Sequence, residues 1–575
     1  MGAMASGMVF YAKSNLVVLD VAVTEHDRPV KELDERRFHI YEDGREQQIA
    51  SFDEHQPAAG VTLASPGALP PNTYSNTPVY PETGAVNVLL LDALNTPSAD
   101  QERVRRVMID YIGTIKPGTA MAIFTLSSRL RMAAGFTTDF AQLLKVLQRE
   151  KANARGPSAV GSGKGSDLST DLEHAASSVA VSSDPGTIWL VGQIMQFAAD
   201  MKSYDTDQRE SITLEAFNEL ARYLAAIPGR KNVIWFSGSF PIGIGPDALV
   251  RTQLKNVRDY SGDVTRTSEL LAAARVAVYP VDARGLMTAP ASDATYIAPP
   301  MGGFNDPRAS VRNDNSSFVE QTSLEQGSMS SIAAETGGRV YSAGNDLKAA
   351  LEKITANDSY YYALSYVPPQ KDSGRHGAEF HKIEVKLDGG KYQLDYRRGY
   401  YTDDTSKLAG NAGGVAGPMT AAAVPGAPPS TQILFQAQVL PEDDAQLSGK
   451  APESQPAGET AAGANAGSHR YVVDLEVQLN DLTFAPEADG ATGTRFECAL
   501  VAYDGEAKPV KSLARSFDYA LPADQYERLS AADKSVSERL AVDLPAAAVG
   551  VRIVVYDPAS AKTGSLEIPL HVPSR

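Results

Sequence analysis

The stretch that decides the fold is Val86-Asn87-Val88-Leu89-Leu90-Leu91-Asp92-Ala93-Leu94-Asn95-Thr96-Pro97. Its apolar run predicts a buried strand over 86–92, followed by a turn and a helix that begins near Ser98. Two later apolar runs, 231–237 and 276–282, end in the same way at Ser237 and Asp282. Because the carboxyl ends of parallel strands form the ligand-binding edge of α/β sheets, we expect Asp92, Ser237 and Asp282 at one edge.

Strand and helix patterns alternate through residues 86–357, which predicts an α/β domain with a doubly wound, mainly parallel sheet. Further expected strands lie at 119–126, 129–134 and 338–342, and expected helices at 98–114, 138–149, 188–226, 245–274, 327–336 and 345–355. Two insertions rich in small and polar residues, 151–185 and 287–326, read as long loops, and disorder is the expectation for the first.

Alternating apolar and polar residues on both sides of this domain predict β-sandwiches. Residues 14–55 and 358–401 are expected to form one small sandwich, with the α/β domain inserted between its two halves. A polar, Pro-rich stretch at 56–84 reads as a spacer. Residues 403–430, rich in Ala, Gly and Pro, read as a linker, and residues 431–573 as a C-terminal β-sandwich.

The composition is that of a globular protein, with 43% hydrophobic residues among 575 and a formal net charge of −17. This charge argues against nucleic acid or an anionic membrane as the main partner. The single cysteine, Cys498, excludes an internal disulfide and reads as a core residue. No apolar run is long enough to span a membrane. Residues 1–8 read as an expression remnant that replaces a native export signal, so we expect an extracytoplasmic location.

Several motifs together resemble the von Willebrand factor type A fold, specifically the VWFA-related acidobacterial domain family. The resemblance covers roughly residues 14–401 and rests on the segments 89–92 (LLLD), 227–238 (IPGRKNVIWFSG), 278–285 (VYPVDARG), 335–338 (ETGG), 361–368 (YYALSYVP) and 398–401 (RGYY).

The resemblance implies a metal-ion-dependent adhesion site, where an Asp-x-Ser-x-Ser turn, a loop Thr and a later Asp hold Mg²⁺. The match is incomplete, because Leu94 replaces the first hydroxyl and Ser237 replaces the later Asp. The residues carried over as metal candidates are Asp92, Asn95, Thr96, Ser237 and Asp282, with Ser211 or Thr213 as the loop hydroxyl. The alternative for Asp92 is a structural one, in which the carboxylate accepts backbone N–H bonds at the helix start.

The chain carries no His-Glu-x-x-His, Gly-x-Ser-x-Gly or Walker-type motif. The favoured hypothesis is therefore an exported, non-enzymatic binding, adhesion or scaffold protein with a degenerate metal site, whose partner is a protein or a glycan. The rivals are a divalent-metal-dependent hydrolase that uses Asp92 and Asp282, and a structural subunit of the cell envelope. The oligomeric state stays open at this stage.

Overall fold

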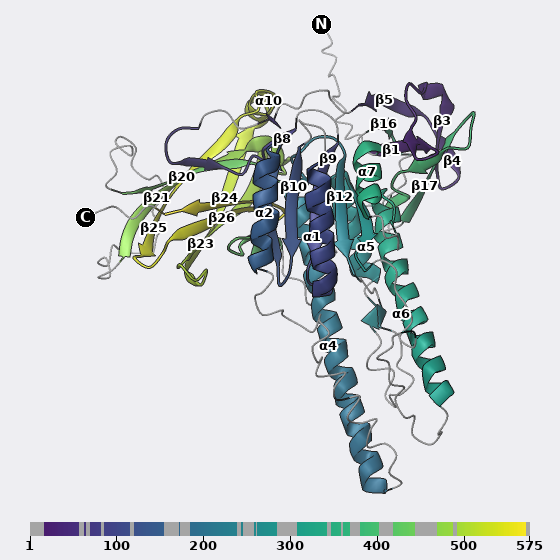
Figure 1. Cartoon of the computed structure of the whole chain (residues 1–575). Helices are drawn as coiled ribbons and strands as arrows, with labels where there is room; N and C mark the ends of the chain where they lie inside the picture. Colours follow the sequence, from purple (N-terminus) through teal and green to yellow (C-terminus); the bar gives the residue numbers. More distant parts are fainter. Residues whose placement is uncertain are drawn as a thin grey trace.

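The structure, a computed structural model, describes residues 16–56, 63–64, 69–81, 85–114, 120–153, 172, 184–238, 243–244, 258–259, 261–284, 292, 307–341, 347–357, 360–368, 380–401, 418–442, 468–486 and 491–570. The expected remnant at 1–8, most of the insertion at 151–185 and residues 403–417 lie outside this set. The α/β domain occupies the centre, with a small sandwich on one side and a larger one on the other (Figure 1).

The central sheet is mixed and has the strand order β11-β10-β9-β12-β15. These strands are β9 (Val86–Asp92), β10 (Met121–Leu126), β11 (Leu130–Thr137), β12 (Lys231–Ser237) and β15 (Val276–Asp282). Neighbouring strands from β10 to β15 pair in parallel, and β11 pairs antiparallel with β10 at one edge. The strand order reverses at β9, which has β10 on one side and β12 on the other.

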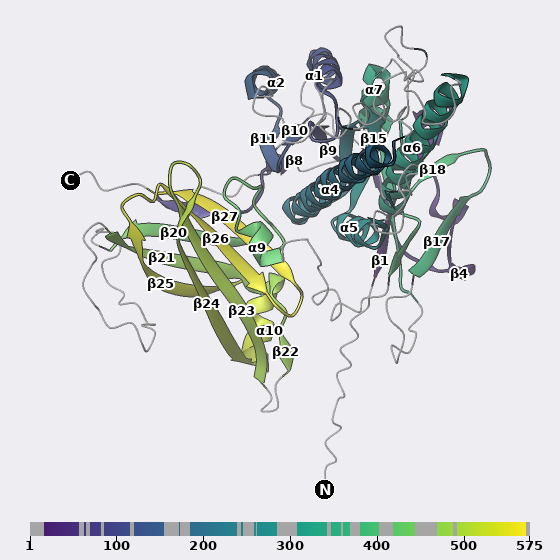
Figure 2. The same ribbon diagram turned by 90° about the horizontal axis from the view of Figure 1, so that it is seen from below.

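Helices cover both faces of this sheet (Figure 2). One face carries α1 (Ser98–Ile112), α2 (Phe140–Asn153) and α7 (Leu347–Asn357), and the other carries α4 (Pro185–Leu224), α5 (Ser261–Ala273) and α6 (Pro307–Thr336). Alternation along β9 explains this division, because Leu89 and Leu91 pack with α1 and α2 while Val88 and Leu90 pack with α4. Every residue of β9 is buried, as expected of a strand covered on both sides.

The helices differ from expectation in two places. Residues 307–326, expected in a loop, form the amino half of α6. Serines normally disfavour a helix interior, but Ser316 and Ser323 donate their hydroxyls to the carbonyls of Arg312 and Val319, four residues earlier. Of the expected helix 245–274, the described part is α5, preceded by the short strand β14 (Arg258–Asp259) that pairs with β13 (Gly243–Ile244).

Two long helices extend beyond the sheet at the carboxyl ends of its strands (Figure 1). α4 runs antiparallel to β12, and its Thr213 lies level with the strand ends, where it contacts Asn95. From Thr213 back to Pro185 the helix spans about 40 Å at roughly 1.5 Å per residue. Asp184 caps its start by accepting a bond from the Thr187 amide, and Pro185 occupies its first turn. The amino half of α4 is therefore a projection from the body.

The small sandwich has two sheets around an aromatic core. One sheet has the order β18-β1-β16-β5, with β2 beside β1, and the other has the order β19-β17-β3-β4. The strands are β1 (Val17–Glu25), β2 (Arg28–Pro29), β3 (Phe38–Glu42), β4 (Arg45–Gln47), β5 (Ile49–His55), β16 (Tyr361–Tyr366), β17 (Phe380–Leu387), β18 (Gln393–Asp395) and β19 (Gly399–Tyr401). Each sheet thus contains strands from before and after the α/β domain.

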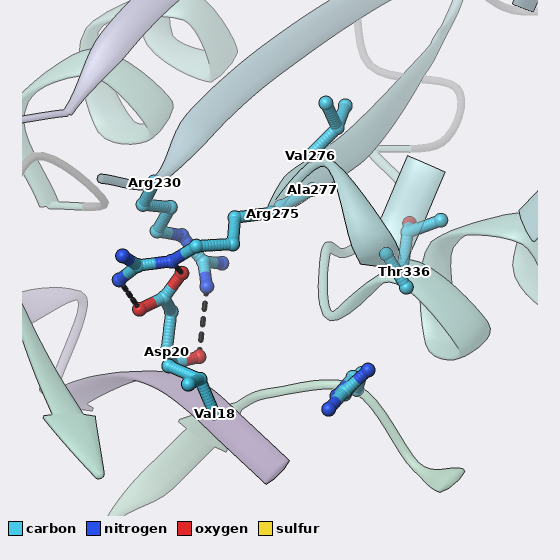
Figure 3. A pocket seen from close by; sticks show the side chains of 9 residues that line it. Val18, Asp20, Arg230, Arg275, Val276, Ala277 and Thr336 are labelled. Carbon is cyan, nitrogen blue, oxygen red and sulfur yellow. Dashed lines mark hydrogen bonds and ion pairs between the residues drawn. The ribbon is translucent and has the colours of Figure 1, made fainter. Parts of the chain in front are cut away.

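Charged side chains join this sandwich to the α/β domain (Figure 3). The Arg275 guanidinium pairs with the Asp20 carboxylate of β1, and Arg230 Nη1 donates to the Asp20 carbonyl at 2.8 Å. Arg230 Nη2 donates to the Gly337 carbonyl at 2.7 Å. The cavity between these groups, about 20 Å³, has room for about one water molecule. The junction is a packed contact between domains rather than a ligand pocket.

The C-terminal sandwich consists of the sheets β25-β21-β20-β7 and β22-β23-β26-β27, with β24 beside β23. The strands are β7 (Thr73–Ser75), β20 (Phe435–Pro441), β21 (Ser468–Gln478), β22 (Ala485–Pro486), β23 (Ala491–Tyr503), β24 (Pro509–Pro522), β25 (Ser535–Pro545), β26 (Gly550–Asp557) and β27 (Lys562–Pro569), with the helices α9 (Pro418–Ala422) and α10 (Ala523–Ala531). Cys498 lies in the core of this sandwich, as expected.

Parts of the two stretches that composition assigns to a spacer and a linker are packed into this sandwich. From the spacer, β7 pairs with β20, and the Asn76 amide donates to the carbonyls of Ser430 and Ile433, both at 2.8 Å. From the linker, residues 418–430 pack over β26 and β27. There the buried Arg552 donates to the carbonyls of Ala422, Ala427 and Pro428. The Arg552 guanidinium has five N–H donors and so satisfies the backbone carbonyls of this segment. The composition of the segment does not predict this contact.

Candidate functional site

The candidate site lies where the strand order reverses, at the carboxyl ends of β9 and β12. Asp92 ends β9, and the turn 93–97 leads from it into α1. Ser237 ends β12, which pairs in parallel with β9. In α/β sheets such a reversal leaves a crevice outside the strand ends, where ligands bind. The five sequence-predicted residues Asp92, Asn95, Thr96, Ser237 and Asp282 all lie at this edge, and all are buried.

The Asp92 carboxylate is fully enclosed and accepts four hydrogen bonds. One oxygen accepts from the Asn95 backbone amide at 2.9 Å. The other accepts from Asn95 Nδ2 at 2.9 Å, Trp235 Nε1 at 3.1 Å and Ser237 Oγ at 2.8 Å. Burial raises the pKa of Asp92, and these hydrogen bonds oppose that rise. All of these donors come from the chain itself.

Asn95 connects this carboxylate to the projecting helix. Its Nδ2 donates both to Asp92 and to Thr213 Oγ1, at 2.9 Å each. Of the two candidates for the loop hydroxyl, Thr213 is the one that contacts Asn95, and it lies within α4, in the expected helix 188–226. Thr96 acts on the other side, where its Oγ1 accepts from the Gly238 amide at 2.9 Å. A Cβ at Gly238 would lie 2.7 Å from the Asn95 carbonyl, so this position has room only for glycine.

Asp282 belongs to a separate polar cluster. Its oxygens accept from the Arg284 backbone amide at 2.9 Å and from the Arg284 guanidinium at 3.2 and 3.3 Å. Arg284 also donates to Glu325 of α6 at 2.6 Å. Backbone pairing places Asp282 beside Ser237, but its carboxylate is engaged by Arg284. The structure therefore places Asp92 and Asp282 at one edge, each in its own network.

The Asp92 edge does not fit a divalent cation as it is arranged. Mg²⁺ requires several oxygen ligands around an open centre. Here the Asp92 oxygens already accept four donors, and Leu94 is part of the apolar core at the position of the first hydroxyl. Asn95 presents its amide nitrogen to Asp92, and Ser237 uses its hydroxyl as a donor to the same carboxylate. The donors fill the space around Asp92 that an ion would need.

Trp235 is the residue that sequence reasoning missed. It reads as core, and it is fully buried against Phe217, yet its indole N–H reaches Asp92. The alternation of side chains along a strand would have predicted this contact. Residues two apart point to the same face, so Trp235 shares a face with Ser237, beside the strand that ends in Asp92.

The amino half of α4 carries a stripe of exposed apolar side chains. Leu190, Phe197 and Tyr204 are 51%, 56% and 66% exposed, and Ile194 and Met201 are partly exposed between them. Their spacing alternates between four and three residues, the pattern of the a and d positions of a coiled coil. We call residues 190, 194, 197, 201 and 204 the α4 stripe. Trp189 is also exposed but lies outside this pattern.

Comparisons with known proteins give limited information. No family model and no curated protein sequence matches the chain. Solved structures similar to it include an aerotolerance-related membrane protein from Bacteroides fragilis (14% identity, 48% of this chain and 98% of that one, TM-score 0.23). A minor pilin, PilB, from Streptococcus sanguinis is similar at 8% identity (48% and 60%, TM-score 0.23). A von Willebrand factor type A protein from Catenulispora acidiphila is similar at 11% identity (63% and 76%, TM-score 0.16). At these TM-scores the likenesses add nothing to what the strand order itself shows.

No helix among the described residues combines the length and the apolar character that crossing a membrane requires.

Proposed function

We propose that this chain is a non-enzymatic, extracytoplasmic binding or scaffold protein that engages a helical segment of a partner protein through the α4 stripe. The observation that carries the proposal is an exposed, heptad-spaced apolar stripe on a helix that extends past the strand ends. Large exposed apolar patches in soluble proteins mark interaction sites. An apolar seam with this spacing fits a second helix.

The fold supports this proposal through the arrangement of the α/β domain. The strand order and the helices on both faces fit a doubly wound domain of the von Willebrand factor A type with a degenerate metal site. We extend the proposal to the division of the chain: a small sandwich from 14–55 and 358–401, the α/β domain at 86–357, and a C-terminal sandwich that begins near residue 418 and includes β7.

The Asp92 network has a positioning role in this proposal. Asp92, Thr96 and Ser237 are each fully buried, so a partner cannot contact them without rearrangement. The Asn95 side chain instead donates hydrogen bonds both to the Asp92 carboxylate and to the Thr213 hydroxyl, at the point where α4 extends beyond the sheet. The network thereby fixes the base of the projecting helix. A metal-dependent hydrolase is not favoured, because the donors of the chain itself engage both Asp92 and Asp282.

The charges beside the α4 stripe indicate the partner's chemistry. Asp200, Asp205 and Asp207 occupy positions that flank the seam, where charges determine partner choice in coiled coils. A second copy of the chain would place like charges together, and the net charge of −17 adds to that repulsion. The expected partner helix therefore carries apolar residues at its a and d positions and Lys or Arg beside them. A glycan partner is the alternative outcome of the experiment.

The experiment uses two labelled helical peptides with Leu and Ile at the a and d positions, one flanked by Lys and the other by Glu. Fluorescence anisotropy measures their binding to the full chain. Half-exposed Leu190 and Phe197 each gain about 1 to 1.5 kcal/mol on complete burial, so each contributes roughly tenfold in affinity. We expect the Lys peptide to bind, binding to weaken with salt, and the double variant Leu190→Gln, Phe197→Gln to lose about 100-fold.

Trp189→Gln is the matched control, because it removes an even more exposed apolar side chain from the same helix outside the seam. It should change the affinity less than threefold. Equal binding of both peptides, or equal losses in the two variants, would show nonspecific adsorption and refute the proposal. Sedimentation at micromolar protein concentration tests the rival hypothesis of a structural envelope subunit. Self-association that the double variant abolishes would support that rival hypothesis. If the chain binds a glycan on an array and the double variant binds it equally well, the binding surface lies outside α4.

A further inference from the structure

A second group of chemistry-bearing residues lies in the small sandwich, far from α4. Glu42 ends β3, Asp43 follows it in the turn to β4, and His381 is the second residue of β17. One ligand atom from each of the three residues can be chosen so that all lie within 4.8 Å of one another. Glu42 and His381 are 4% and 3% exposed.

The two carboxylates converge on one nitrogen of the imidazole. His381 Nδ1 lies 2.8 Å from Asp43 Oδ2 and 3.8 Å from Glu42 Oε1. An ion with bonds of about 2.0 to 2.1 Å in tetrahedral geometry separates its ligand atoms by about 3.3 Å. The two observed separations from Nδ1 lie on either side of that value, and the ligand atoms of the three residues all lie within 4.8 Å of one another.

The surrounding residues already orient the ligands. Glu42 Oε2 accepts hydroxyl bonds from Tyr366 at 2.7 Å and Tyr400 at 3.2 Å, which leaves Oε1 directed at His381. Asp43 Oδ1 accepts the Lys382 amide at 3.0 Å, which leaves Oδ2 for the same point. Partners of this kind fix the ligands in metal sites. Asp43 is more exposed than the other two, which provides access from solvent.

Glu42 brings a buried carboxylate into this group. Within the described part of the chain, His381 is the only cationic side chain at ion-pair distance from Glu42. Buried charges in proteins are normally paired or bound to metals. A divalent cation would neutralise the group, with the imidazole proton carried on Nε2.

We infer that Glu42, Asp43 and His381 form a binding site for one divalent transition-metal ion, for which Zn²⁺ is the best fit. One nitrogen and two carboxylate oxygens suit Zn²⁺, with water in the fourth position. Bound metal would join the β3–β4 turn to β17 and stabilise the small sandwich. The site shares no residue with the α4 stripe, so either proposal can fail without the other.

His39 offers a matched control within the same sandwich. It also lies between two carboxylates, Glu46 at 2.8 Å and Asp388 at 3.3 Å, but these face opposite nitrogens of its ring. Such an arrangement cannot place all three groups on one ion. His39→Gln therefore removes a histidine with two acidic neighbours while leaving the proposed ligands in place.

The test is calorimetric titration of Zn²⁺ into chelator-treated full-length chain, with Co²⁺ absorption as the second readout. We expect one ion per chain in wild type and in His39→Gln, and affinity at least 100-fold weaker in His381→Gln. Asp43→Asn, which keeps the amide contact to Lys382, should weaken binding about tenfold. Co²⁺ should give the visible bands of four-coordinate cobalt without a thiolate band, because the single cysteine, Cys498, is buried in the core of the C-terminal sandwich.

Circular dichroism of each variant shows whether it is folded, and Asp43→Asn supplies the test if His381→Gln is not. Saturable binding that depends on His381 but not on His39 establishes the site. Failure of wild type to bind Zn²⁺, retention of wild-type affinity in His381→Gln, or an equal loss in His39→Gln would overturn it.

Discussion

Glu210 of α4 makes the stability of the α/β domain depend on pH in an unusual direction. Its side chain is 1% exposed, and its Oε1 has no hydrogen-bond partner among the described residues. Burial raises the pKa of Glu210 from 4.5 to about 9, and the nearby Asp207 and Asp263 contribute to this rise against the lowering effect of Arg209. The folded protein therefore holds this carboxyl group protonated at neutral pH.

The sign of the effect follows from proton linkage. Between pH 4.5 and about 9 the folded state binds one more proton than the unfolded chain, so its stability falls as pH rises. The slope is about 1.4 kcal/mol per pH unit. By pH 7 the loss from this group reaches about 3 kcal/mol, and the full stability contribution is present only below pH 4.5. Glu210→Gln, which is neutral at every pH, removes this loss.

Urea unfolding at several pH values between 4 and 9 measures the difference. The Trp189→Phe background leaves the buried Trp235 as the only tryptophan, so its fluorescence reports on the α/β core. We expect Glu210→Gln to match its parent near pH 4 and to exceed it by about 3 kcal/mol at pH 7. Asp200→Asn on the exposed face of the same helix is the control, because it replaces an exposed carboxyl group by the same acid-to-amide change. Parallel stability curves for Glu210→Gln and its parent would refute the reasoning.

Three further predictions concern buried groups in the same domain. Asp92→Ala removes the acceptor of four buried hydrogen bonds and should cost about 4 kcal/mol in urea unfolding. Asp139→Ala, which removes an exposed helix cap, should cost about 1 kcal/mol, and similar losses in the two variants would contradict the network. Gly338→Ala places a Cβ 1.9 Å from the Val278 carbonyl oxygen and should lower the free energy of unfolding by more than about 3 kcal/mol. Its control is Gly192→Ala, whose Cβ meets nothing within 4 Å and which should raise the free energy of unfolding by about 1 kcal/mol. Burial lowers the pKa of Lys231 to about 7, so the unfolded chain holds the extra proton between pH 7 and 10.5 and stability rises with pH there. Lys231→Met should therefore gain about 5 kcal/mol at pH 6 and much less at pH 10, and a gain independent of pH would rule out this explanation.

The central strands could be predicted from sequence because strands that are buried on both faces consist almost entirely of apolar residues. The observed bounds of β9, β12 and β15 coincide with the predicted strands 86–92, 231–237 and 276–282. Continuous apolar runs of this length between turn signals are typical of strands covered on both faces. The amino half of α6 lacked such a signal, because its residues are mostly small and polar, and serines there bond to carbonyls of the preceding turn.

The candidate site was predictable in position but not in chemistry. Strand ends locate Asp92 and Ser237, and the turn motif suggests Asn95. These residues could coordinate an ion or form hydrogen bonds with one another. Which of the two occurs depends on the directions of their side chains, which sequence spacing does not determine. The Trp235 indole is the clearest example, because an apolar run gives no reason to expect a polar contact from its largest member. The place of β7 was hidden for a similar reason, since three residues in a Pro-rich stretch acquire a strand only by pairing with β20.

The pairing of β7 with β20 has a consequence for the order of events during biosynthesis. Asn76 and Phe435, which bond across this contact, lie 359 residues apart. At about 5 to 20 residues per second, the ribosome needs roughly 20 to 70 s to make the second after the first. β1 waits almost as long for β16, its antiparallel neighbour. The small and the C-terminal sandwich both stay open until these later strands have been made, and the apolar face of β1 must be shielded until then.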